Sequence, residues 1–288
     1  MLYFIKDNLR RYPYIRKAWN SLQWKKHIYS DWLYTYIFKK TIQSDTPFGF
    51  KMIARNYIAN RMMTEGTFET EEVELIKNNI LNSDVFVDVG ANIGFYTCIA
   101  CSLGKYVVAI EPQPQNLYCL YANLNNNNWP DTEVFPLGLS NKPGLLMLYG
   151  ASGPSASLVS GWAGYSKRFK RVIPVNTLDT LLGDRFSGKK LFIKIDVEGA
   201  EYNVLLGALK TLCVSPRPTW FIEICLNEFQ PNGINPNYEA TFNLFWQHGY
   251  TVRMANKANT LVDPIDIKNW VINMRPENNN FNYLFIPN

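Results

Sequence analysis

A glycine-rich segment, Asp88-Val-Gly90-Ala-Asn92-Ile-Gly94, has the chemistry of a ligand-binding turn. It lies between a β-branched run and a helical pattern, which predicts a turn from a strand into a helix. Glycines there let a ligand approach the backbone, and ligands of open α/β sheets bind outside the carboxyl ends of the strands. Glu111 lies 21 residues after Gly90, at the end of the next predicted strand, where a carboxylate binds ribose hydroxyls. These features predict a site for a cofactor that contains adenosine.

Two cofactors fit that spacing, a nicotinamide dinucleotide and S-adenosylmethionine. The dinucleotide fingerprint G-x-G-x-x-G is absent, because position 92 is Asn and the spacing is G-x-x-x-G. Asp88 would repel a diphosphate, whereas it would attract the ammonium and the sulfonium of S-adenosylmethionine. Charge therefore favours the methyl donor, and the alternative is a turn with a purely structural role.

A second charged cluster follows a later predicted strand, in the sequence Lys194-Ile-Asp196-Val-Glu198. Side chains alternate along a strand, so Lys194 and Asp196 point to the same face. Asp196 at the strand tip can orient or deprotonate a substrate hydroxyl, with Lys194 tuning its charge. Glu223 ends the neighbouring predicted strand. Asp196, Glu198 and Glu223 can therefore form a carboxylate cluster that holds Mg²⁺. The alternative is that Lys194 and one acid only neutralise each other in the interior.

Strands that alternate with helices would bring these residues to one edge of a sheet. The predicted strands cover residues 85–89, 106–110, 134–137, 191–195, 220–224, 250–254 and 283–286, and the predicted helices cover 68–80, 95–103, 116–124, 200–212 and 238–247. This alternation predicts a mostly parallel, doubly wound α/β sheet with both faces covered.

The alternation fails between residues 141 and 171, where five glycines predict an insertion that is mobile or contains a hairpin. Lys167, Arg168, Lys170 and Arg171 lie near its end. They can hold an anionic substrate group such as a phosphate, although a solvated face is the more common role of such a run.

Residues 1–40 carry most of the positive charge of a chain whose net charge is +5. They hold nine Lys or Arg and two Asp or Glu, which leaves 20 basic and 22 acidic side chains in the other 248 residues. Aromatic residues are interleaved with these cations, a combination that suits an anionic interface. For residues 1–45 we therefore weigh peripheral contact with a membrane or a glycan-assembly complex against a helical cap on the main domain, and favour the cap.

Composition narrows the class of protein. Hydrophobic residues make up 47% of the 288 residues and charged residues 18%, which indicates a folded core and excludes a mainly disordered chain. No run reaches the ~20 apolar residues of a spanning helix, and residues 1–11 lack the apolar stretch of a secretory signal. We therefore expect a cytoplasmic protein, with any membrane contact peripheral. The five cysteines fit reduced thiols, and Cys98-x-x-Cys101 lacks the second ligand pair of a zinc site.

The chain resembles the FkbM family of S-adenosylmethionine-dependent methyltransferases in four ordered segments, DVFVDVGANIGFYT, AIEPQPQN, IKIDVEGAEYNVLLGA and FIEI. The resemblance covers roughly residues 65–255. It implies a Rossmann-like, seven-stranded methyltransferase sheet and, most often in the family, O-methylation of a hydroxyl on a sugar or natural product. We expect an N-terminal basic, aromatic helical extension over residues 1–64 and the methyltransferase domain over residues 65–288.

Matched by motif, the resemblance implies roles for individual residues. Glu111 would bind the ribose, and Glu69 matches the family's acid that closes over the donor. Many family members carry a His after the FIEI segment, where this chain has Cys225, so Asp196 or Glu223 is the candidate base. The implied donor-binding residues are Glu69, Asp88, Gly90, Asn92, Gly94, Tyr96 and Glu111, and the candidate catalytic residues are Lys194, Asp196, Glu198 and Glu223.

The function predicted from the sequence is an S-adenosylmethionine-dependent O-methyltransferase that methylates a hydroxyl of a sugar or glycan, with a small molecule or a glycan as its acceptor. The need for a divalent metal stays open. One alternative is a nicotinamide-dependent sugar oxidoreductase, and another is a non-catalytic scaffold of the same fold that binds a partner through its N-terminal arm. Nucleic acid is not expected as a partner, because the cations cluster on the arm and no nucleic-acid module is recognised.

Overall fold

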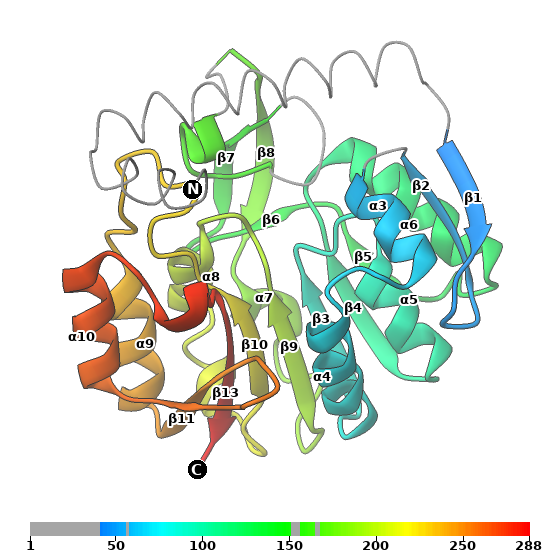
Figure 1. Ribbon diagram of the computed structural model, residues 1–288. Coiled ribbons are helices and arrows are strands. Elements are labelled where there is room, and N and C mark those ends of the chain that lie inside the picture. Colours follow the sequence, from blue (N-terminus) through cyan, green and yellow to red (C-terminus); the bar gives the residue numbers. More distant parts are fainter. Residues whose placement is uncertain (1–40, 56–57, 151–155, 165–167) are drawn as a thin grey trace, which may run out of the picture.

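The computed structural model describes residues 41–55, 58–150, 156–164 and 168–288, which are built around one large sheet (Figure 1). In these residues the sheet has eight strands, in the order β12-β11-β13-β10-β9-β3-β4-β5. The strands are β3 (Val85–Val89), β4 (Tyr106–Ile110), β5 (Glu133–Phe135), β9 (Leu191–Ile195), β10 (Thr219–Glu223), β11 (Tyr250–Met254), β12 (Leu261–Val262) and β13 (Asn282–Pro287).

The strand directions are those of a Rossmann-like α/β sheet, so the predicted fold class is confirmed. β5, β4, β3, β9 and β10 pair in parallel, whereas β13 lies antiparallel between β10 and β11. All seven predicted strands are present. The two-residue β12, which pairs antiparallel with β11, is an eighth strand that is too short to leave a periodic signal in the sequence.

Helices cover both faces of this sheet. Along β3 the side chains alternate between the two faces, so that Phe86 and Val87 belong to different core clusters. The predicted helix over 200–212 is shorter than expected, because α8 ends at Leu206 and residues 211–213 form a separate 3₁₀ turn. One face packs α4 (Thr70–Leu81), α5 (Phe95–Ser102) and α6 (Pro114–Asn126), and the other packs α7 (Leu178–Leu182), α8 (Glu201–Leu206), α9 (Tyr238–Gln247) and α10 (Pro264–Asn273).

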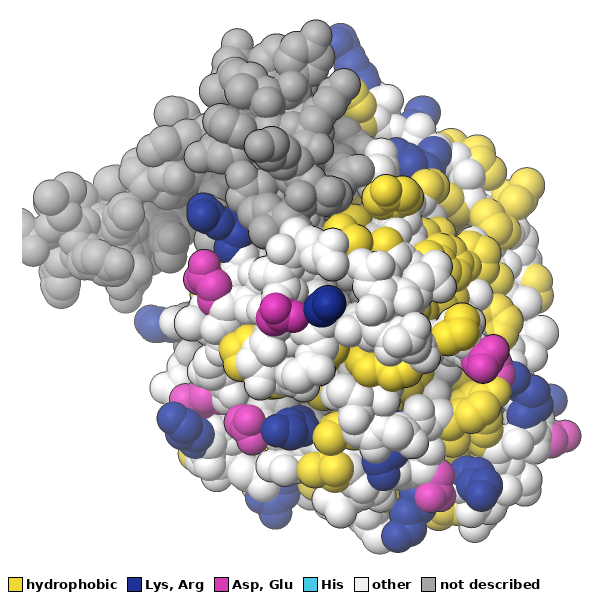
Figure 2. Space-filling model, turned by 90° about the vertical axis from the view of Figure 1, so that its right-hand side faces the viewer, with side chains coloured by type: hydrophobic (Ala, Val, Ile, Leu, Met, Phe, Trp, Pro, Cys, Tyr) yellow, Lys and Arg dark blue, Asp and Glu magenta, His cyan; other side chains and the backbone are white. Residues whose placement is uncertain are grey.

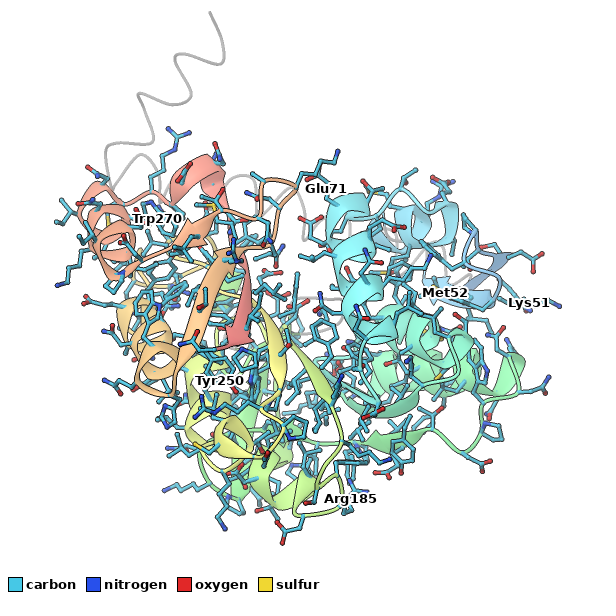
Figure 3. The ribbon with its side chains drawn as sticks, turned by 90° about the horizontal axis from the view of Figure 1, so that it is seen from below. Lys51, Met52, Glu71, Arg185, Tyr250 and Trp270 are labelled. Atoms are coloured by element: carbon cyan, nitrogen blue, oxygen red, sulfur yellow. The ribbon has the colours of Figure 1, made fainter. Side chains whose placement is uncertain are left out.

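The described part of the chain starts with a hairpin rather than a helix. β1 (Thr41–Asp45) pairs antiparallel with β2 (Lys51–Arg55), and α3 (Ile58–Glu65) follows. Asn123 of α6 donates to the carbonyl oxygen of Ile53 at 3.1 Å, and Met52 is fully buried while Lys51 points away from the body (Figure 3). The helical prediction is therefore wrong for residues 41–55. Residues 1–40 lie outside the described residues, and the domain boundary at residue 64 stays a prediction.

A second sheet occupies the region where the predicted alternation fails. Its order is β6-β8-β7, from β6 (Gly138–Leu139), β7 (Gly144–Tyr149) and β8 (Lys170–Asn176), and it stands above the central sheet in Figure 1. β7 and β8 pair antiparallel over six residue pairs, so of the two alternatives, a mobile insertion or one that contains a hairpin, the structure shows the hairpin pairing. Lys167 lies outside the described residues, so its predicted role stays a prediction.

The surface of the described residues mixes polar and apolar regions. On the face in Figure 2, hydrophobic side chains gather toward one side, and Lys, Arg, Asp and Glu are interspersed over the lower part. Within the described ranges, no helix has the length and apolar character needed to cross a membrane.

Candidate functional site

The glycine-rich segment forms the turn between β3 and α5, as predicted. Gly90, Asn92 and Gly94 have φ angles of 84°, 52° and 87°, in the left-handed region. The backbone N–H of Gly90 donates to the carbonyl oxygen of Ile110 at 2.9 Å, which fixes the turn to the end of β4. A Cβ atom on residue 90 would lie 1.8 Å from the carbonyl oxygen of Asp196. Glycine is therefore required at this position for the close approach of the end of β9, whether or not a ligand is bound.

Glu111 holds this turn in place from the end of β4. Its Oε2 accepts from the backbone N–H of Asn92 at 2.9 Å, and its Oε1 accepts from the backbone N–H of Gln113 at 2.7 Å. The side-chain amide of Asn116 donates to Oε1 at 3.2 Å. Burial raises the pKa of Glu111 to about 7, although these hydrogen bonds oppose the rise. Glu111 and the glycine-rich turn, which were both predicted to bind the cofactor, thus contact each other directly, and the contact of Glu111 with a ribose stays a prediction.

Lys194 is a buried ammonium between two carboxylates. It is the register partner of Asp88 on the adjacent strand, and its Nζ donates to Oδ2 of Asp196 at 3.0 Å. The same Nζ lies 5.0 Å from the centre of the Tyr96 ring. Burial opposes the charge of Lys194, but Asp196 and Asp88 outweigh that effect and raise its pKa.

Asp88 does not face the cavity described below, in contrast to the prediction that it contacts the donor directly. Its side chain is 1% exposed, and its Oδ2 accepts from the hydroxyl of Thr97 on α5 at 2.7 Å. Among the described residues, its Oδ1 has no hydrogen-bond partner. Burial raises its pKa, and Lys194 is the strongest opposing influence. Because α5 covers Asp88, its charge acts on the site through Lys194.

Glu69 and Tyr96 meet at the start of α4 and α5. The hydroxyl of Tyr96 donates to Oε2 of Glu69 at 3.0 Å, and Glu69 precedes α4 with a left-handed φ of 39°. Burial raises the pKa of Glu69 to about 7, with Asp196 adding to the rise and Lys194 opposing it. The contact brings the acid that was predicted to close over the donor to the same site.

Trp162, which the sequence analysis missed, holds a residue of the site in place. Its Nε1 donates to Oε2 of Glu198 at 2.7 Å, and its side chain is 1% exposed. Burial, followed by the charge of Asp196, raises the pKa of Glu198 to about 8. A Cβ atom on residue 199 would lie 2.4 Å from the Trp162 ring, so Gly199 lets the ring pack against the turn that carries Glu198. The sequence signal was only a tryptophan in the irregular 141–171 segment.

Glu201 and Glu223 complete the group of buried acids. Glu201 accepts from the backbone N–H of Gly199 at 2.9 Å and so holds the same turn; burial raises its pKa to about 7. Burial, with neighbouring carboxylates, raises the pKa of Glu223 well above its ordinary value. Cys225 stands where the resembling family often has His, and its Sγ donates to Oε1 of Glu223 at 3.6 Å.

One cavity of about 300 Å³ joins these groups at the carboxyl ends of β3, β4 and β9. Asp88 and Gly94 are the two predicted site residues that do not contribute to its wall. Leu148 of β7, Leu158 and Met63 of α3 supply apolar parts of the wall. The predicted residues on the wall are Glu69, Gly90, Asn92, Tyr96, Glu111, Lys194, Asp196, Glu198 and Glu223.

The charge of this wall suits a cationic ligand. Of the described residues that form it, five carry a carboxyl group and one, Lys194, carries an ammonium. A bound cation would lower the raised pKa values of Glu69, Glu111 and Glu198 and so bind more tightly as they ionise. A sulfonium and an ammonium fit this wall better than a diphosphate does.

The acids do not form a metal site. In the described part of the chain, no group of three or more His, Cys, Asp or Glu side chains is placed to hold a metal ion. The magnesium cluster that was considered for Asp196, Glu198 and Glu223 is therefore not formed. Cys98 and Cys101 are free thiols in the core around α5.

Comparison with known proteins gives a family match. The family described as the methyltransferase FkbM domain matches residues 88–252 of the chain. A curated relative, the hexuronic acid methyltransferase AglP of Haloferax volcanii, is 33% identical over 146 residues, which cover 50% of this chain and 58% of the relative. The chain thus spans less than two thirds of the length of that relative.

Similar solved structures have low sequence identity. A SAM-dependent methyltransferase from Agrobacterium tumefaciens is 11% identical with a TM-score of 0.41, over 85% of this chain and 69% of the other. An O-methyltransferase from Bacillus cereus, solved in complex with SAH, is 12% identical with a TM-score of 0.39, over 75% of this chain and 80% of the other.

Proposed function

The chain belongs to the FkbM family of methyltransferases, and on that premise we propose that it transfers a methyl group from S-adenosylmethionine to a hydroxyl oxygen of a sugar or glycan. The observation that carries the proposal is the position of Asp196, which shares one cavity with the glycine-rich turn and with Glu111. Methyl transfer to a hydroxyl needs alignment of the two reactants and a group that takes the proton. We assign the second of these roles to Asp196.

The acidic wall supports S-adenosylmethionine as the donor. When bound, this cofactor supplies a methyl group that its sulfonium already activates. Glu111 would bind the ribose hydroxyls, while the turn at Gly90 and Asn92 would lie against the ligand. Glu69 and Tyr96 would close the site from the start of α4 and α5. A nicotinamide dinucleotide would bring its diphosphate against the same carboxyl groups, so the charge of the wall disfavours that alternative.

Asp196 is the proposed proton acceptor for the acceptor hydroxyl. Its ion-pair partner Lys194 has a side chain that is 5% exposed, whereas the side chain of Asp196 is 33% exposed, so the carboxylate is the outer member of the pair. Burial raises the pKa of Glu198 to about 8 and the pKa of Glu223 well above its ordinary value, so both favour the protonated form more than a solvated carboxyl does. A protonated carboxyl donates a hydrogen bond and can orient an acceptor oxygen, so we assign that role to Glu198 and Glu223 and the role of base to Asp196.

The carbohydrate part of the proposal is supported by the relative whose name is a hexuronic acid methyltransferase. A hexuronic acid offers both hydroxyls and a carboxylate as methyl acceptors. An acceptor carboxylate beside Asp196 would be repelled and would need no base. The geometry therefore favours a hydroxyl oxygen.

Methyl transfer from isotopically labelled S-adenosylmethionine to matched hexosides and hexuronides tests the proposal. The labelled products are then treated with alkali, which cleaves a methyl ester and leaves a methyl ether intact. We expect alkali-stable label on at least one glycoside. Alkali-labile label alone would contradict hydroxyl transfer. Donor binding without transfer to any sugar would contradict the sugar acceptor and favour the non-catalytic alternative.

A further inference from the structure

The β7–β8 hairpin carries apolar side chains on both of its faces. The inner face includes Leu148 and Ile173, which are 1% and 4% exposed, and Leu146, which is 39% exposed. The other face points outward, and Leu145 and Val172 on it are 71% and 59% exposed. Paired residues and residues two apart share a face, so the strand register assigns the outer hairpin face to Leu145, Met147, Tyr149, Lys170, Val172 and Pro174.

This outer hairpin face is unusual for a solvated sheet. An antiparallel sheet with one face in water normally has polar side chains at the outward positions. Here five of the six outward positions are apolar. The inner face does not account for them, because it packs its own cluster, and Leu148 on it also lines the cavity. A contiguous exposed apolar face of this kind marks an interaction surface.

The segment that contains the hairpin has charged residues of one sign only. Residues 141–176 contain five Lys or Arg and no Asp or Glu, whereas the rest of the chain after residue 40 contains 15 basic and 22 acidic residues. Lys170 lies on the face itself, and Lys142 is exposed just before β7. Phe169, next to Lys170, is 55% exposed. Cations are therefore concentrated where apolar and aromatic side chains are exposed.

We propose that the outer hairpin face docks onto a membrane surface that contains anionic phospholipid. Leu145 and Val172 would enter the boundary between headgroups and acyl chains, and Lys142 and Lys170 would lie at the level of the phosphates. The ring of Phe169 belongs to a residue class that favours the boundary region. Two copies of the chain stacked through this face would bring like charges together, so the charge pattern fits an anionic surface better than a second copy.

Vesicle flotation of the full chain tests the proposal. The vesicles are an equal mixture of phosphatidylcholine and phosphatidylglycerol, with pure phosphatidylcholine in parallel. The test variant is L145D/V172D, and the matched control is I265D/I272D on α10, where the two isoleucines are 67% and 76% exposed. Both variants replace two exposed apolar residues by two aspartates, and both keep the N-terminal arm, so neither charge nor the arm distinguishes them.

We expect the wild type to float with the anionic vesicles, less with pure phosphatidylcholine, and less at high salt. The partition coefficient of L145D/V172D should fall about tenfold or more, while that of I265D/I272D should stay within about twofold of the wild type. Because aspartate weakens strands, L145T/V172T provides a variant that keeps strand propensity and charge, and it should also bind less than the wild type. Thermal unfolding verifies that each variant is folded.

Three results would overturn the proposal. The first is a wild-type protein that does not float with anionic vesicles. The second is equal flotation of the wild type and folded L145D/V172D. A larger species in the wild type that L145D/V172D converts to monomer, measured by light scattering, would assign the face to a second copy of the chain. None of these readouts depends on methyl transfer, so the docking proposal can fail while the proposed function stands.

Discussion

Lys194 and Asp196 form an ion pair in which the lysine is the buried member, with its Nζ 3.0 Å from Oδ2 of Asp196. Lys194 is also the register partner of the buried Asp88. The ammonium therefore lies between an inner carboxylate, covered by α5, and an outer one on the cavity wall. This arrangement puts the carboxyl group of Asp196 on the cavity wall, where the proposed acceptor hydroxyl would lose its proton.

Asp196→Asn keeps the shape of the side chain and removes the proton acceptor. Turnover should fall by about 100-fold or more, the scale of a lost general base. Calorimetric titration with S-adenosylhomocysteine should give an affinity close to that of the wild type, since Asp196 is not assigned to donor binding. Turnover at the wild-type rate would remove Asp196 as the base.

Glu111→Ala should weaken donor binding. The substitution removes the proposed contact with the ribose and also the acceptor that holds the N–H of Asn92. Because hydrogen bonds to charged groups contribute about 1.5–3 kcal/mol, the dissociation constant for S-adenosylhomocysteine should rise about tenfold or more. Glu239→Ala, at an exposed position on α9, is the control and should bind as the wild type does. Unchanged affinity in Glu111→Ala would count against the ribose contact.

Gly90→Ala should destabilise the fold much more than Gly104→Ala. Both glycines have positive φ angles, 84° and 69°, but only at residue 90 would a Cβ atom meet a backbone oxygen, at 1.8 Å; around residue 104 nothing lies within 4 Å. Left-handed strain alone costs about 1 kcal/mol, and the forced movement of β9 should bring the total for Gly90→Ala to about 2–5 kcal/mol. Chemical denaturation measures the free energy of unfolding of both variants. Equal losses would mean that the contact with Asp196 does not constrain the turn.

Stability should decrease as the pH rises from about 5 to about 8. Burial raises the pKa of Glu111 and Glu201 to about 7 from an ordinary 4.5, so the folded protein binds their protons more tightly than the unfolded chain does. The stability that this provides is fully present below the unfolded pKa and is lost as the pH rises through the folded pKa. Thermal unfolding of the ligand-free protein across this pH range tests the prediction. Glu201→Gln should reduce the dependence of the melting temperature on pH. A melting temperature that rises over the same range would be the opposite of what burial predicts.

The sequence predicted the site best where strand periodicity determines position. Tyr106–Ile110 and Leu191–Ile195 are short, mostly apolar runs that stop at a turn, so the sequence assigns Glu111 and Asp196 to strand ends. Their common cavity follows from the parallel order of β4, β3 and β9.

Contacts between distant segments could not be predicted in this way. The burial of Asp88 depends on Thr97 of the following helix, and the contact between Trp162 and Glu198 joins residues 36 positions apart without a spacing rule. The hairpin at residues 41–55 could not be predicted for the same reason. It is held by Asn123 of α6 and by Asn127 just after that helix, which lie 70 and 76 residues further along the chain than their partners, and no local pattern encodes contacts at that separation.

Calorimetric titration of the wild-type protein with S-adenosylhomocysteine, with NAD in parallel, tests the central claim most directly. The acidic wall and the turn held by Glu111 predict micromolar binding of S-adenosylhomocysteine and no binding of NAD. Binding of NAD alone, or of neither compound, would contradict the assignment of this cavity as a methyl-donor site.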